Sequence, residues 1–133
     1  MRAAVEEAVK FPRLEPHARE LSAALDKLIG VTSHLVGISQ RKGPEPFLAD
    51  ATLYLELFGI VSIAWQWLLQ AIATEKALMK QLPTGEESFY KGKFYVFRYF
   101  FGYELPKIEG LVKRLMNSDG LTVEMDESFF QDS

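Results

Sequence analysis

The sequence predicts an all-α protein, arranged as an antiparallel up-down-up bundle of three long helices. Apolar residues recur at helical spacing through three long segments of the chain. Between these segments, residues 42–46 and 82–86 combine glycine with proline, which marks two short turns. Connections this short place successive helices antiparallel to each other. At 133 residues without a cysteine, the chain is long enough for one domain with its own core and excludes a disulfide framework.

The first long helix is expected to begin around Leu14–Pro16, because proline fits a first helical turn, and to end before Gly43 and Pro44. Residues 1–13 precede it as a lead-in, in which residues 1–11 allow a short extra helix broken at Phe11-Pro12. The predicted apolar face of the long helix comprises Leu21, Leu25, Leu28, Thr32, Leu35 and Val36.

The second long helix is expected from near Pro46 to about Gln81. Its main apolar side comprises Tyr54, Leu57, Phe58, Val61, Trp65, Leu68, Leu69 and Ile72. The charge-free run of residues 57–74 reaches the lower edge of membrane-spanning length. Polar or small residues recur along its opposite side, which favours a buried amphipathic helix over a membrane span: Thr52, Glu56, Gly59, Ser62, Gln66, Gln70 and Thr74.

The third long helix is expected after Thr84, with a kink at Pro106, and to continue to about Asn117. Nine aromatic residues fall between Phe89 and Tyr103. Projected on a helix, its apolar residues form two stripes, which predicts two sets of neighbours. The first stripe comprises Tyr90, Phe94, Phe97, Phe101, Leu105, Ile108, Val112 and Leu115, and the second comprises Phe89, Val96, Phe100, Tyr103 and Leu111. The helical domain is therefore expected to span residues 14–118.

The net charge of −3 comes mainly from residues 119–133, an acidic C-terminal tail with five carboxylates and no lysine or arginine. The rest of the chain is nearly neutral. A nucleic-acid-binding domain needs a large excess of basic residues, so we expect no nucleic-acid partner. The N-terminal residues lack the pattern of a secretory signal or a transit peptide, which favours a cytoplasmic protein.

Few residues are candidates for chemistry. His17 and His34 have no metal-ligand spacing and are expected to lie solvated on a helix surface, so no metal site is predicted. Glu56 is the single charge between residues 51 and 74, and Glu104 lies beside the aromatic stripes, where Arg98 or Lys107 can pair with it. These two glutamates are the candidates for perturbed carboxylates. No catalytic or cofactor-binding residue is predicted. The candidate interface residues are Trp65, Trp67, Phe89, Phe100 and Tyr103.

Two segments of the chain, residues 47–67 (FLADATLYLELFGIVSIAWQW) and residues 89–106 (FYKGKFYVFRYFFGYELP), resemble a known family. They are similar to the extra C-terminal helical domain of large bacterial acyl-CoA dehydrogenases, in the subgroup of 3-methylmercaptopropionyl-CoA dehydrogenase. The resemblance implies a noncatalytic accessory domain of an FAD-dependent enzyme that converts acyl-CoA to trans-2-enoyl-CoA. It further implies that FAD and the catalytic glutamate belong to preceding domains, and that this domain packs on those domains and on a second subunit.

Two other functions remain compatible with the sequence. A stand-alone bundle could bind an acyl chain or a lipid between the aromatic helices. Peripheral membrane attachment through the second helix is the other, but residues 51–74 lack the flanking lysine and arginine that interfacial helices usually carry. The sequence therefore favours the accessory domain, with no membrane partner.

Overall fold

A computed structural model describes residues 1–43, 45, 48, 50–80 and 86–117. Every regular element within these residues is helical, which confirms the predicted all-α class. The elements in chain order are α1 (Arg2–Ala8), α2 (Glu15–Lys42), α4 (Ala51–Leu78), α5 (Glu86–Tyr99), the π-helical segment η1 (Phe100–Glu104), the 3-10 segment η2 (Leu105–Lys107) and α6 (Ile108–Met116). Some predicted features lie largely or wholly outside the described residues. These are the turn near 82–86, the start of the second long helix near Pro46, its end near Gln81 and the acidic tail 119–133.

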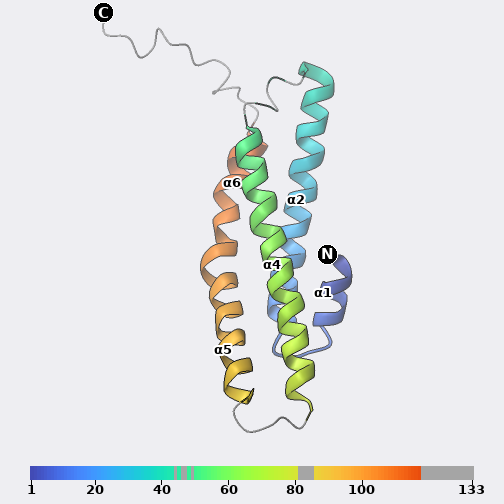
Figure 1. Ribbon diagram of the computed structural model, residues 1–133. Coiled ribbons are helices and arrows are strands. Elements are labelled where there is room, and N and C mark those ends of the chain that lie inside the picture. The colour runs from blue at the N-terminus through green and yellow to red at the C-terminus, as the bar shows by residue number, and fades with distance from the viewer. Residues whose placement is uncertain (44, 46–47, 49, 81–85, 118–133) are drawn as a thin grey trace, which may run out of the picture.

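The long helices run next to one another, as Figure 1 shows. In that view the chain ascends along α2, descends along α4 and ascends again through α5 and α6. Helix α4 contacts α2, α5 and α6, and α6 also packs on α2. The short helix α1 packs against both α2 and α4. Helices α2, α4 and α6 therefore each pack against at least two other helices, whereas α5 packs mainly against α4.

Helix α2 begins and ends where local chemistry predicts. Pro16 lies in its first turn, where a missing backbone N–H costs no intrahelical hydrogen bond. Gly43 follows the helix with φ of 84°, a left-handed conformation that a side chain would strain. The Gly43 N–H donates to the Ser39 carbonyl at 3.0 Å, which satisfies one of the last carbonyls of the helix.

The core is formed by the inward sides of all the helices. Its fully buried large side chains are Phe97, Leu14, Leu21, Leu57, Leu68, Leu115, Val31 and Val61. The predicted apolar faces were too wide at their edges, because Val36, Phe58 and Leu69 are exposed. Thr74, predicted on the polar side, is instead buried, and its hydroxyl donates to the Gln70 carbonyl at 2.9 Å. That internal hydrogen bond lets a hydroxyl enter the core.

The predicted third helix is divided at Pro106. Proline has no N–H and its ring clashes with the carbonyl four residues back, so an α-helical ladder cannot pass through it unchanged. The chain widens before the proline, where the Leu105 N–H donates to the Phe100 carbonyl across five residues. It then tightens through η2, which contains Pro106. The prediction of one continuous helix with a kink is thereby corrected to α5, η1, η2 and α6 in succession.

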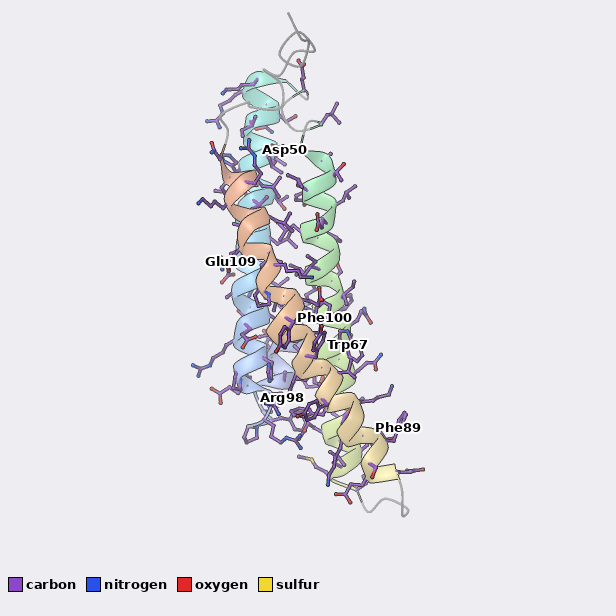
Figure 2. All side chains as sticks on the ribbon, turned by 90° about the vertical axis from the view of Figure 1, so that its left-hand side faces the viewer. Asp50, Trp67, Phe89, Arg98, Phe100 and Glu109 are labelled. Atoms are coloured by element: carbon purple, nitrogen blue, oxygen red, sulfur yellow. The ribbon has the colours of Figure 1, made fainter. Side chains whose placement is uncertain are left out.

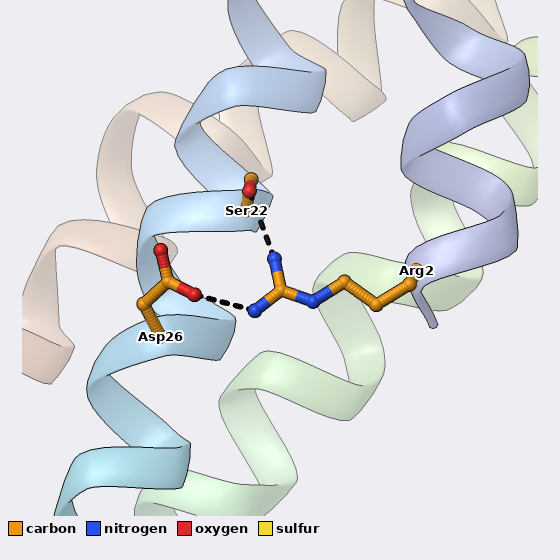
Figure 3. Close-up of polar contacts among 3 residues, drawn as sticks. All are labelled: Arg2, Ser22 and Asp26. Carbon is orange, nitrogen blue, oxygen red and sulfur yellow. Dashed lines mark hydrogen bonds and ion pairs between the residues drawn. The ribbon is translucent and has the colours of Figure 1, made fainter.

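Ion pairs fix the N-terminal lead-in to the bundle. The guanidinium of Arg2 donates to the Ser22 hydroxyl at 2.9 Å and pairs with Asp26, both on α2 (Figure 3). Glu7 pairs with Lys76 on α4. The pKa of Glu7 is lowered, and the hydrogen bond from Lys76 is the largest cause of this shift. Helix α1 thus contacts two helices through small buried residues and two exposed ion pairs.

Candidate functional site

The two predicted aromatic stripes of the third helical segment have different environments. Six members of the first stripe are buried in the core: Phe94, Phe97, Phe101, Leu105, Ile108 and Leu115. In the second stripe, Phe89 is 59% exposed, Val96 47% and Tyr103 67%. Monomeric soluble proteins scatter exposed apolar side chains singly, so a row of them along one helix marks a candidate interaction surface.

The five predicted interface residues divide into two groups. Phe89 and Tyr103 are exposed, whereas Trp65, Trp67 and Phe100 are partly buried and pack against the core. In Figure 2, Trp67 and Phe100 lie where α4 and the end of α5 run next to each other, and Phe89 and Arg98 lie at opposite edges of α5. The structure therefore brings Trp67 and Phe100 to the border of the exposed surface.

Two further exposed aromatic residues were missed by the sequence analysis. Tyr95 is 73% exposed and Tyr99 56%. The Tyr99 and Tyr103 rings stack with centroids 4.8 Å apart, and the Arg98 guanidinium lies 5.8 Å from the Tyr95 ring centroid. The spacing of four residues between Tyr99 and Tyr103 is the signal that could have placed them on one face.

The two candidate carboxylates lie near one lysine. Lys107 Nζ donates to Glu104 Oε2 at 2.8 Å, so of the two predicted partners of Glu104 the structure selects Lys107. This hydrogen bond and the Glu104 charge raise the pKa of Lys107, with smaller contributions from Tyr99 and Glu56. Glu56 itself is exposed. The arrangement is a surface charge cluster at the Tyr103 end of the aromatic row.

His17 does not lie on a solvated surface as predicted. Its ring is half-buried edge-on against Phe97 and Phe101, with centroid distances of 4.7 and 5.4 Å. Its Nδ1 atom is buried without a hydrogen-bond partner. Burial, and secondarily the charge of Arg98, lower the pKa of His17. His34 is also half-buried, with Nε2 enclosed, so the surface prediction is wrong for both histidines.

We expect His17 to make the stability of the fold depend on pH. Because its pKa is lowered in the folded chain, the unfolded chain binds more protons just below pH 6.5. The free energy of unfolding should therefore fall as the pH falls from about 7 to about 5. Urea denaturation across this range checks it, and His17→Leu should reduce the slope. Equal slopes for the two proteins would contradict the assignment.

The described residues enclose a groove of about 390 Å³ between α2 and the η1–η2 segment. Its floor is apolar, with Ala24, Phe101 and Leu105 among its members, and its rim carries Glu20 and the Lys27–Glu109 ion pair. Burial raises the pKa of Glu20. No group of three or more histidine, cysteine or acidic residues able to hold a metal ion occurs within the part of the chain that the structure describes.

Helices α2 and α4 are long and apolar enough to cross a membrane by length and composition alone. Both contribute core side chains, including Leu21 and Leu68, and core helices of soluble proteins meet the same criteria. These two properties therefore provide only weak evidence for a membrane span.

Comparison with known proteins agrees with the earlier resemblance at the level of the family. A family model described as acetyl-CoA dehydrogenase C-terminal like matches residues 1–126. No curated protein is significantly similar to the chain. The match extends over the lead-in helix, the bundle and the exposed aromatic row. The chain therefore belongs to the family of acetyl-CoA dehydrogenase C-terminal-like domains.

Proposed function

We propose that this chain is a noncatalytic accessory domain that packs on the catalytic domains of a cytoplasmic acyl-CoA dehydrogenase and contributes to contacts with a second subunit. The observation that supports it is the exposed row of Phe89, Val96, Tyr99 and Tyr103 on a helix whose opposite side is already buried. Large apolar side chains aligned in this way are typical of a surface that another protein covers. We further propose membership of the 3-methylmercaptopropionyl-CoA dehydrogenase subgroup, on the segments 47–67 and 89–106.

Acyl-CoA dehydrogenases of this family use FAD, but the groove between α2 and η1–η2 does not suit that cofactor. A flavin dinucleotide carries a pyrophosphate, which needs backbone N–H groups or free cations. The larger groove instead presents Glu20 and Glu109 at its rim, and its lysine, Lys27, is already paired with Glu109. These carboxylates would repel a pyrophosphate. We therefore assign FAD, and the oxidation of acyl-CoA to trans-2-enoyl-CoA, to the catalytic domains.

The proposal predicts two properties of the purified chain. It should show no flavin absorbance and no acyl-CoA oxidation with an artificial electron acceptor, and it should bind separately expressed catalytic domains of the parent dehydrogenase. In calorimetry, Phe89→Ser/Tyr103→Ser should weaken this binding at least about tenfold, because each buried aromatic side chain contributes roughly 1–3 kcal/mol.

The matched control is Ile29→Ser. Ile29 is 56% exposed but lies on α2, away from the aromatic row, so this variant should bind as the unmodified chain does. Equal losses for the two variants, or unchanged binding of the aromatic variant, would contradict the proposed packing surface.

The groove supports a second candidate, a stand-alone bundle that binds an acyl chain or lipid. Its apolar floor is the favouring observation, although it lies between α2 and η1–η2 and not between the two aromatic helices. A Cβ at Gly102 would meet no atom within 4 Å, so Gly102→Leu can fill the groove without a clash at Cβ. Binding of a fluorescent fatty acid that this variant abolishes would favour the second candidate.

A further inference from the structure

The exposed row on α5 and η1 has a narrower geometry than a general apolar patch. Its members are separated alternately by three and four residues. This spacing aligns them in one narrow strip along the helix, which a single partner helix can cover. We define this seam as Phe89, Gly92, Val96, Tyr99 and Tyr103, all of them exposed. Buried Phe94 and Phe101 lie on the opposite side of the helix. The seam spans 15 residues, or about 22 Å at the helical rise, which matches a partner helix of about four turns.

The charges that flank the seam are unevenly neutralised. Lys91 pairs with Glu87 at 3.1 Å and Lys107 with Glu104 at 2.8 Å, so both ends carry compensated pairs. Between these ends, Lys93 donates only to the neutral Gln70 amide, at 3.3 Å.

On the other flank of the seam lies Tyr95, and Arg98 follows beyond it, with its guanidinium 5.8 Å from the Tyr95 ring centroid. Within the described residues, neither Lys93 nor Arg98 forms an ion pair with a carboxylate. The remaining acid of this helix, Glu86, is in its first turn, where the helix dipole stabilises a negative charge. The middle of the seam therefore has one uncompensated positive charge on its Lys93 flank and a second, that of Arg98, beyond its Tyr95 flank.

A recess lies beside one end of the seam. Between α4 and α5, a hollow of about 340 Å³ is lined by Gln70, Ala73, Thr74, Phe89, Tyr90 and Lys93. The Lys93 ammonium lies 5.2 Å from the Phe89 ring centroid, at the border between this hollow and the seam. A side chain that projects from a partner helix can enter this recess while the rest of that helix follows the seam.

We propose that the seam docks one amphipathic helix of the catalytic domains, with an apolar stripe flanked by carboxylates that face Lys93 and Arg98. The source of this helix rests on the proposed function, whereas its chemistry rests on the seam alone. A second copy of α5 fits less well, because it would bring its own Lys93 and Arg98 to a seam that already carries both.

Two synthetic helices test this chemistry directly. Both have the same alanine-rich stripe over about three heptads and a side-chain lactam that holds the helix, but one carries glutamate and the other lysine at the flanking positions. The full chain should bind the glutamate peptide at least about tenfold more tightly than the lysine peptide. The difference should shrink at about 1 M salt, where the Debye length is about 3 Å.

Charge-reversal variants locate the effect. Lys93→Glu/Arg98→Glu should reverse the preference between the two peptides. Lys80→Glu/Lys113→Glu makes the same change in net charge at two exposed positions, one just after the end of α4 and one on α6, and should keep the original preference. Tyr99→Ser/Tyr103→Ser should weaken both peptides. Circular dichroism confirms that each variant is folded before its binding is interpreted.

Several outcomes would overturn the proposal. These are equal affinities for the two peptides, no binding of either, or a preference that Lys93→Glu/Arg98→Glu leaves unchanged. Self-association of the chain, or binding to phosphatidylglycerol vesicles, that is lost in Tyr99→Ser/Tyr103→Ser would assign the seam to another occupant. A different result would contradict the proposed function. If the chain prefers the glutamate peptide but does not bind the catalytic domains, the chemistry of the docked helix is right and its assignment to the catalytic domains is wrong.

Discussion

Replacement of Phe97 by alanine is expected to lower the free energy of unfolding by about 3–5 kcal/mol. Phe97 is 1% exposed, and its ring centroid lies 5.6 Å from Phe94, 4.8 Å from Phe101 and 4.7 Å from His17. The truncation therefore removes a large apolar side chain from the core and leaves a cavity among three rings that cannot all close over it. Urea denaturation followed by far-ultraviolet circular dichroism measures the loss.

Phe89→Ala is the matched control for this prediction, because it makes the same chemical change on the same helix. Phe89 is 59% exposed, so its removal should change the free energy of unfolding by no more than about 0.5–1 kcal/mol. A loss at Phe89 as large as the loss at Phe97 would mean that the seam belongs to the core of the isolated chain and is not a free surface.

Arg13→Met is expected to destabilise the fold by about 1–3 kcal/mol. Arg13 pairs at 3.4 Å with Glu75, whose side chain is only 12% exposed, and its guanidinium lies 3.9 Å from the Phe94 ring centroid. The substitution leaves a largely buried carboxylate without its cation and removes a cation–π contact. Because Arg13 is itself half-exposed, the effect should stay below that of a fully buried pair.

A double-mutant cycle separates these contributions. Arg13→Met/Glu75→Gln should cost less than the sum of the two single variants, because it leaves no buried charge behind. Arg19→Met serves as the comparison, since Arg19 is 76% exposed and its pair with Glu15 spans one helical turn. It should cost at most about 0.5 kcal/mol. Equal costs for the two arginine variants would show that burial of Glu75 contributes little.

Periodicity alone predicted the helical class and two apolar stripes on the third helical segment, of which the first is largely buried and the second is exposed at Phe89, Val96 and Tyr103. It succeeded because position on a straight helix depends only on sequence separation. It failed at the edges of each face: Val36, Phe58 and Leu69 are exposed because neighbouring helices cover only part of the circumference. The helical wheel gives the direction of a face, whereas its covered width depends on tertiary packing.

The environment of each polar candidate could not be predicted from local sequence. His17 is separated from Phe97 by 80 positions, yet their rings touch because α2 and α5 pack in one bundle. Glu56 and Glu104 are far apart along the chain but both act on Lys107. Such groups come together only through the fold. For Glu104, by contrast, the spacing of three residues to Lys107 already allowed the observed pair.

The paired irregular turns around Pro106 have a consequence for rotation about the helix axis. A π turn holds more residues than an α turn and so underwinds the chain, whereas a 3-10 turn holds fewer and overwinds it. Because η1 and η2 follow each other directly, their opposite deviations from the α-helical twist partly cancel. Helix α6 consequently emerges with its apolar side, including Ile108 and Leu115, still aimed at the same core that Phe97 and Phe101 enter. The proline is thereby accommodated without a change in the direction that the helix faces.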